Sequence, residues 1–349
     1  MKNISKLIVG ILFSALVMTP SFAGELSVTG GATATFTMNG DDDSQGRNIG
    51  ISNELDFNAS GELDNGYTWT YQVQLDTASA VNDDTKLVIG MGDLGTIGIF
   101  NTEGGLSQEL HGVGALGAGY DYVSPATFQE GMDVSSYSNI QYHTPAGLLP
   151  LGASVKVGYV PNMNATTQIS AKESAAEASQ ATGRAMEQIT ISLAPIDGLT
   201  IAADAANTDD ETGTVGSGGV EQGVSANVHA KYTMGALTVG YAESGYQPAI
   251  ASGELAYYEG QKYGIQYDVS DAVSISYNID KSEKNQRVAV AVGATAGTRT
   301  QTEMEQESWQ IAYTTGGATI GLATADVSNS DYVDGKDERQ TVVSLGISF

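Results

Sequence analysis

Apolar and polar side chains alternate every two residues along most of the sequence, and this period indicates what backbone the chain can form. In "YTWTYQVQLD", Thr, Gln and Asp alternate with an apolar set made of Trp69, Tyr71, Val73 and Leu75. Successive side chains of a β-strand point to opposite faces, so the pattern predicts strands with one apolar face. Sixteen strands are expected, at residues 25–38, 48–60, 67–76, 85–91, 96–101, 138–145, 152–161, 184–196, 199–208, 223–234, 237–247, 257–270, 273–283, 303–315, 318–327 and 337–349.

The expected strands are joined by short and long connections in turn. Short turns such as "DG", "GA" and "GG" use residues that suit tight hairpins, whereas the other gaps run from about eight residues to almost forty. Long connections therefore lie at one end, as in an up-and-down barrel that crosses a membrane. The polar face is rich in small side chains that would not fill a soluble core. The alternative is a large soluble β-sandwich with a wet outer face.

Composition excludes several classes of protein. Charged residues make up 16% of the 349, and no segment after the N-terminus reaches a dozen consecutive apolar residues, so spanning helices are not expected. A hydrophobic content of 41% is too high for a disordered chain. The net charge of −26 opposes binding to nucleic acid, and the absence of cysteine leaves hydrogen bonding and burial to stabilise the fold.

The N-terminus predicts export. Lys2 and Lys6 precede an apolar run at residues 7–18, and Ser21 and Ala23 occupy the −3 and −1 positions of a cleavage site before Gly24. We therefore expect a signal peptide at 1–23 and a single barrel at 24–349. An uncleaved anchor is the alternative, although the run is short for a spanning helix.

Motifs that would indicate an enzyme or a cofactor site fail on their context. "GVGALG" at 112–117 fits the dinucleotide pattern but follows no βαβ unit. "DDDSQG" at 41–46 resembles the start of a calcium loop, but its twelfth position is Ser52 rather than a glutamate. The three histidines lie in different segments, and no nucleophile elbow is present. We expect no enzyme and no cofactor; a weak divalent-cation site at the outer loops stays open.

The signal peptide, the sixteen alternating strands, the long third connection and the terminal "LGISF" resemble the general diffusion porins of the Gram-negative outer membrane, in particular those of alphaproteobacteria. The resemblance implies an all-β fold, a 16-stranded antiparallel transmembrane β-barrel with a long third loop folded into the lumen. It also implies a multi-pass protein of the cell outer membrane that forms a homotrimer and contacts lipid and lipopolysaccharide. In that family the last strand pairs with the first, and the terminal aromatic, here Phe349, is read by the outer-membrane assembly machinery.

The third connection supplies the predicted pore constriction. It carries no Lys or Arg, and its acids are Glu103, Glu109, Asp121, Glu130 and Asp133. By strand parity, acids and bases on the inner wall are nearly balanced, and the bases predicted to face the loop are Lys86, Lys156 and Lys231. Acidic clusters in a narrow passage favour cations.

The sequence therefore predicts a passive channel for small hydrophilic solutes and ions, with a preference for cations. A substrate-selective channel of the same fold is the alternative, and a surface barrel without a pore is a third class.

Overall fold

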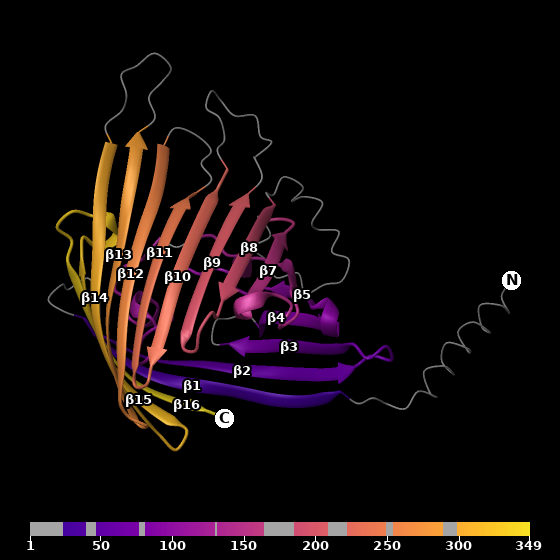
Figure 1. Cartoon of the computed structure of the whole chain (residues 1–349). Helices are drawn as coiled ribbons and strands as arrows, with labels where there is room; N and C mark the ends of the chain where they lie inside the picture. The colour runs from indigo at the N-terminus through magenta and orange to yellow at the C-terminus, as the bar shows by residue number, and fades with distance from the viewer. Residues whose placement is uncertain are drawn as a thin grey trace, which may run out of the picture.

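Sixteen antiparallel strands close into a barrel in the computed structural model, which describes residues 24–39, 47–76, 81–129, 131–163, 185–208, 222–248, 254–288 and 299–349 (Figure 1). The strands are β1 (Glu25–Asn39), β2 (Asn48–Glu62), β3 (Thr68–Asp76), β4 (Val81–Gly90), β5 (Thr96–Asn101), β6 (Asn139–His143), β7 (Ser154–Val160), β8 (Met186–Leu193), β9 (Leu199–Thr208), β10 (Val224–Met234), β11 (Leu237–Gln247), β12 (Glu254–Ser270), β13 (Val273–Val288), β14 (Arg299–Thr315), β15 (Ala318–Ser328) and β16 (Glu338–Ser348). Among the residues described, no helix is both long enough and apolar enough to cross a membrane.

The barrel closes where β1 pairs with β16. Their register runs from Gly31 opposite Ser348 to Asn39 opposite Gln340, and every other strand pairs with its neighbours in the chain. Closure removes the two unpaired edges that an open sheet would expose. In Figure 1, β16 in yellow runs beside β1 in indigo.

All sixteen predicted strands are confirmed, although some run further than the apolar alternation does. β13 continues to Val288, five residues past the expected end, and β14 begins at Arg299. On β13 the apolar alternation ends at Ile279, because the next outward side chains, Lys281 and Glu283, are charged, while the backbone pairing continues to the end of the strand.

The outer face has an apolar band that ends at a row of aromatic side chains. The end of the barrel that carries the long connections is here called the loop end. At the edge of the band on that side, the rings of Tyr241 and Tyr263 lie 5.2 Å apart and those of Tyr277 and Trp309 lie 4.5 Å apart. The Tyr241 hydroxyl donates a hydrogen bond to Glu243, so its polar end points away from the band. Rings with one wet end are typical of a membrane interface.

Most of the buried apolar core lies between the strands and the segment at 102–138, which joins β5 to β6 and is here called the inner segment. It contains a short helix, α2 (Gly119–Tyr122), and a 3-10 turn, η2 (Val134–Ser136). All three clusters of buried apolar side chains combine residues of this segment with residues of the wall. Three further 3-10 turns, η1 (Gly92–Leu94), η3 (Pro150–Gly152) and η5 (Ser330–Tyr332), lie in connections between strands.

Candidate functional site

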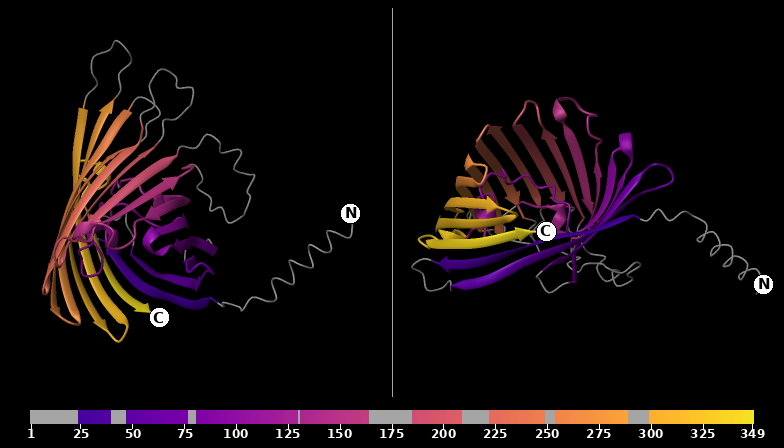
Figure 2. Two further views of the ribbon diagram at one scale, coloured as in Figure 1. Left: turned by 45° about the vertical axis from the view of Figure 1, so that its right-hand side comes forward. Right: turned by 90° about the horizontal axis from the view of Figure 1, so that it is seen from below.

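The inner segment lies on the inner side of the barrel wall (Figure 2), where it bonds to inward side chains of β8, β9 and β13. The backbone N–H of Gln108 donates to Asp204 Oδ1 over 2.6 Å, and that of Tyr120 donates to Asp280 Oδ2 over 2.9 Å. The Gln310 side chain accepts a hydrogen bond from the N–H of Leu116 over 2.8 Å and donates one to the carbonyl of Gly117 over 2.8 Å. Side chains of the wall thus supply the hydrogen bonds that an irregular backbone needs when it is buried.

Glycines at inward positions of the wall make room for side chains of the inner segment. These glycines are Gly158, Gly240, Gly264 and Gly321. A Cβ atom on Gly264 would lie 2.4 Å from Cε1 of His111, and one on Gly321 would lie 2.8 Å from Cδ1 of Leu116. Since real Cβ contacts are not that short, the segment can only sit this close to the wall where the wall has no side chain.

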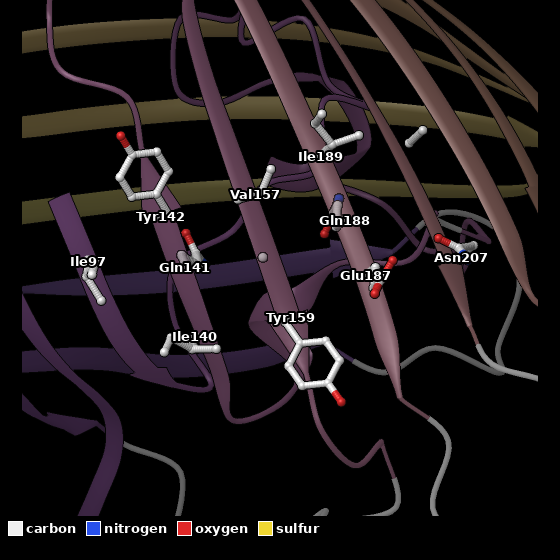
Figure 3. A pocket seen from close by; sticks show the side chains of 12 residues that line it. Ile97, Ile140, Gln141, Tyr142, Val157, Tyr159, Glu187, Gln188, Ile189 and Asn207 are labelled. Atoms are coloured by element: carbon white, nitrogen blue, oxygen red, sulfur yellow. The ribbon is translucent and has the colours of Figure 1, made fainter. Parts of the chain in front are cut away.

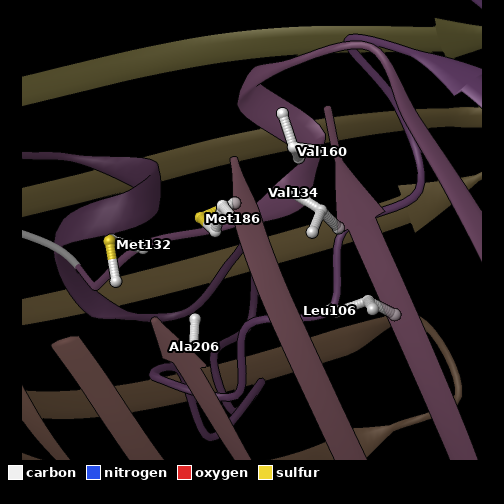
Figure 4. Close-up of a cluster of buried hydrophobic side chains, with 6 residues drawn as sticks. All are labelled: Leu106, Met132, Val134, Val160, Met186 and Ala206. Atoms are coloured by element: carbon white, nitrogen blue, oxygen red, sulfur yellow. The ribbon is translucent and has the colours of Figure 1, made fainter. Parts of the chain in front are cut away.

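Both ends of the inner segment pack into one apolar cluster (Figure 4). The segment contributes Leu106, Met132 and Val134, and the wall contributes Val160, Met186 and Ala206 from β7, β8 and β9. Val134, Val160 and Met186 have no exposed surface. Burying an aliphatic side chain of this size contributes roughly 1.5–3 kcal/mol, so the cluster holds the segment firmly where it leaves β5 and returns to β6.

Two of the predicted constriction acids bond to the backbone of the segment itself. Asp133 accepts hydrogen bonds from the N–H groups of Leu106, Ser107 and Ser135, at 2.9, 3.0 and 3.1 Å. Glu109 Oε2 accepts a hydrogen bond from the N–H of Gly131 over 2.8 Å. These contacts join the outgoing and returning arms of the segment, so both carboxylates shape it.

The remaining predicted acids differ in placement. Glu103 lies 3.5 Å from the Lys86 ammonium on β4, and both side chains are partly exposed. Asp121 is exposed on α2. Glu130 lies outside the described residues.

The predicted basic residues are not gathered on one wall. Lys86 faces the start of the inner segment, whereas Lys156 lies on β7 opposite His143 in the register. Lys231 on β10 lies beneath the segment, with its ammonium 3.9 Å from where a Cβ of Gly112 would be. Strand parity indicates that a lysine points inward, but not which part of the inner wall the segment covers.

Lys262 contacts the inner segment, although it is not among the three bases predicted to face that loop. It is 4% exposed, donates to the Glu109 carbonyl over 2.9 Å and lies 4.9 Å from the centre of the Tyr120 ring. A lysine this deeply buried is stabilised by such contacts rather than by water. Its inward parity was the only signal that the sequence offered.

His111 is the most buried of the histidines and is held in one tautomer. Its Nδ1 accepts the N–H of Val113 over 3.1 Å, so the proton of the neutral ring is on Nε2. Burial is the largest cause, followed by the charges of Lys262, His229 and Lys231, and together they lower the pKa of His111 to about 4. The ring is therefore neutral near pH 7.

Aromatic rings also line the inner face near the loop end. Tyr246 and Tyr258 stack with ring centres 6.1 Å apart, and Tyr258 lies 5.5 Å from Tyr332 of η5. The Tyr332 hydroxyl is 2.7 Å from Ser282 Oγ, which fixes η5 against β13.

A hollow of about 590 Å³ lies on the outer face of β5–β9 (Figure 3). Apolar side chains such as Ile140, Tyr142 and Ile189 line it. It opens on the face opposite to the inner segment, so it takes no part in the candidate passage.

The described part of the chain holds no group of three or more His, Cys, Asp or Glu side chains arranged to bind a metal ion. The acidic stretch at 41–46, predicted as a weak divalent-cation site, lies outside the described residues. The same is true of residues 1–23, the predicted signal peptide.

Phe349 closes the barrel at the other end of the chain. Its N–H donates to the Gly30 carbonyl over 2.9 Å, and the Gly30 N–H donates back to the Phe349 carbonyl over 2.9 Å. The side chain is 66% exposed.

No protein-family model matches the sequence, and no curated protein matches it. Solved structures do match. In-vitro folded OmpT, an outer membrane protein of Vibrio cholerae, gives a TM-score of 0.63 at 10% identity over 95% of this chain and 99% of that one. An anion-selective porin from Comamonas acidovorans gives 0.62 at 12% identity, over 93% of this chain and 100% of that one. OmpF of Salmonella typhi gives 0.59 at 15% identity, over 95% and 99%. The chain therefore has the closed β-barrel fold of these outer-membrane proteins.

Proposed function

We propose that this protein is a passive channel of the cell outer membrane, through which small hydrophilic solutes and ions diffuse. The observation that carries the proposal is the two-faced barrel: inward side chains are small and polar, and outward ones form an apolar band with an aromatic border. A water-filled interior enclosed by a lipid-facing wall is the arrangement of a porin.

The finer assignment is a general diffusion porin of the alphaproteobacterial type, assembled as a homotrimer. A solved trimer form of Vibrio cholerae OmpT is among the similar structures. Small outward residues on β1, namely Gly30, Ala32 and Ala34, would allow close packing between subunits. The mature chain would be 24–349 in contact with lipid and lipopolysaccharide, with Phe349 read by the assembly machinery. We propose neither enzymatic activity nor a resident cofactor.

A preference for cations is part of the proposal. The chain carries a net charge of −26, and the inner segment contains five acids and no Lys or Arg. In a narrow passage these charges are screened less than on an open surface. Permeant anions would therefore be repelled from the passage, and permeant cations would be concentrated in it.

Conductance in planar bilayers tests this function. The purified protein is expected to form open channels without any added ligand, and the zero-current potential in a KCl gradient is expected to have the sign of a cation-preferring pore. Heat-unfolded protein is the control. A folded barrel that conducts no ions would refute the channel, and an anion-preferring potential would refute the ion preference alone.

The second candidate is a substrate-selective channel, favoured by the inward tyrosines Tyr246, Tyr258 and Tyr332 near the loop end. Rings in contact offer flat apolar faces on which a sugar could stack. Liposome swelling with neutral sugars of graded size separates the two candidates. A rate that falls smoothly with size supports general diffusion, and a sharp preference for one sugar supports selectivity.

A further inference from the structure

The connection between β15 and β16, at residues 329–337, lies against the inner segment and is here called the strap. Its 3-10 turn, η5, accepts two hydrogen bonds from the backbone of that segment. The N–H of Thr127 donates to Asp331 Oδ1 over 3.2 Å, and the N–H of Gln129 donates to the Tyr332 hydroxyl over 3.2 Å. Among the described residues, these are the hydrogen bonds that join the 124–129 stretch of the inner segment to the rest of the barrel.

Tyr332 joins this stretch to the wall. Its hydroxyl lies 2.7 Å from Ser282 Oγ on β13, and its ring centre lies 5.5 Å from that of Tyr258 on β12. The ring also packs against a buried cluster that combines both parts, made of Tyr120 and Phe128 of the inner segment, Met304 of β14 and Val327 of β15. Phe128 is 6% exposed, so the stretch is packed against the wall as well as bonded to the strap.

Backbone preference does not explain the position of the strap. Three of its residues that carry side chains have positive φ: Asn329 at 52°, Asp331 at 55° and Tyr332 at 60°. Such conformations are uncommon outside glycine, above all for a bulky residue, and they persist where contacts determine them. The contacts here are those to the inner segment and an ion pair within the strap, in which the Lys336 ammonium lies 2.7 Å from Asp331 Oδ2.

We propose that Tyr332 is a positioning residue that holds the 124–129 stretch against β13–β15 and so keeps it out of the passage through which solutes diffuse. The inference rests on the proposed channel function. The inner segment lies on the inner side of the wall, so a part of it that leaves the wall enters the lumen. The diameter of the open path limits the solutes that a channel admits, and the strap is therefore a second determinant of that limit beside the inner segment itself.

A spin label tests whether Tyr332 holds the stretch. The chain has no cysteine, so Thr127→Cys gives a single site for a nitroxide. Thr127 is exposed, and its bond to the strap uses the backbone N–H, which the substitution keeps. By electron paramagnetic resonance, the nitroxide is expected to be more mobile when Tyr332→Ala is added. Tyr332→Phe should give an intermediate spectrum, because it loses only the hydroxyl.

Tyr257→Ala is the matched control, because it removes the same side chain from an outward position of β12 and should leave the spectrum unchanged. Heat-modifiable migration shows which variants have folded. An unchanged spectrum in folded Tyr332→Ala, or an equal rise in mobility in Tyr257→Ala, would overturn the proposal. If Tyr332→Ala does not fold, Tyr332→Phe decides, and unchanged mobility there overturns the proposal. This measurement needs no conductance, so it does not depend on the channel function.

Liposome swelling tests the effect on permeation. Tyr332→Ala is expected to lower the rate for the largest permeant sugar roughly twofold relative to the smallest, since the loosened stretch obstructs the path. Asp331→Gly should act in the same direction, because glycine adopts a φ of 55° without strain but removes the acceptor for the stretch. Asp334→Gly removes the same charge from an exposed position of the strap and should leave the rates unchanged. A more mobile label with unchanged swelling would overturn the role in size selection, whereas a wild-type protein that admits no sugar would count against the channel itself.

Discussion

At the scale of single residues, Gly264 shows how a missing side chain positions a loop. It lies inward on β12, directly beneath His111, and Asn278 of β13 is its Cα partner in the register. A Cβ atom there would lie 2.4 Å from Cε1 of His111 and 2.7 Å from Oδ1 of Asn278. Both neighbours are themselves enclosed, so neither can move aside without moving the inner segment.

Gly264→Ala is therefore expected to displace the inner segment while the barrel stays closed. Overpacking of this kind costs roughly 1–3 kcal/mol. Single-channel recording should show a changed conductance with frequent fluctuations. Gly50→Ala is the matched control, because it is also inward and its Cβ would lie 3.6 Å from the nearest atom, Oγ1 of Thr35. Identical recordings from the two variants would show that this glycine does not hold the segment.

Acid should loosen the same contact through His111. The folded-state pKa is about 4, whereas the free side chain titrates at 6.5, so the released segment binds a proton that the seated one does not. The stability of the seated segment is full above pH 6.5, declines as the pH falls, and levels off below pH 4 at a cost on the order of 3 kcal/mol. The facing groups are His229 and Lys231 of β10 and Lys262 of β12, none of which is a carboxylate that would offset the new charge.

The measurement is current noise recorded between pH 7 and pH 4. It is expected to rise in the wild type as the pH falls through this window. His111→Asn keeps an acceptor near Nδ1 but cannot bind the proton in this range, so its noise should stay constant. An equal rise in both proteins would assign the response to another group.

At the scale of elements, β16 completes the barrel by pairing with β1 on one side and β15 on the other. Its last paired residues meet β1, and the two hydrogen bonds between Phe349 and Gly30 extend that ladder by one residue. The Phe349 ring is exposed on the outside, so burial within the chain does not explain an aromatic at this position. The proposed reading of Phe349 by the assembly machinery would account for it.

Phe349→Asp is expected to reduce the amount of folded protein in cells, because the proposed assembly signal is lost. Heat-modifiable migration on gels reports the folded barrel. Phe349→Tyr keeps the aromatic ring and should assemble normally. Refolding of Phe349→Asp from urea into detergent separates signal from stability: normal refolding with poor yield in cells fits a signal, and normal yield in cells would contradict the prediction.

The strands were predictable because their signal is local. Alternation within ten residues sufficed to place β3 and β11, and the same rule stopped early on β13, where Lys281 and Glu283 face outward. The candidate site depends on distant contacts. Nothing near Asp133 in the sequence shows that it binds the backbone 27 residues earlier, and nothing near Lys231 shows that the inner segment covers it. The position of a residue along its strand shows whether its side chain points inward or outward. Whether the inner segment covers that side chain depends on the path of the segment through the barrel.

At the scale of the whole molecule, outward charges indicate which end of the barrel projects from the membrane. On β11–β14 the outward side chains change from mostly apolar to polar or charged near one level, where Glu243, Gln261, Lys281 and Glu305 follow one another in the register. Lys281 forms an ion pair with Glu305 there, outside the apolar band. Strands that continue past this level carry the long connections, so the loop end extends well into water.

Peptide tags test which way this end faces. The end opposite to the loop end carries Gly147, between β6 and β7, and Gly235, in the two-residue turn between β10 and β11. The connections at the loop end include Asp42 and Gly213, which lie outside the described residues. Outer-membrane barrels keep short turns in the periplasm and long loops outside. Tags at Asp42 or Gly213 should therefore bind antibody on intact cells, whereas tags at Gly147 or Gly235 should bind only after the outer membrane is permeabilised. Heat-modifiable migration confirms that each tagged chain has folded, and the reverse labelling pattern among folded chains would place the loop end in the periplasm.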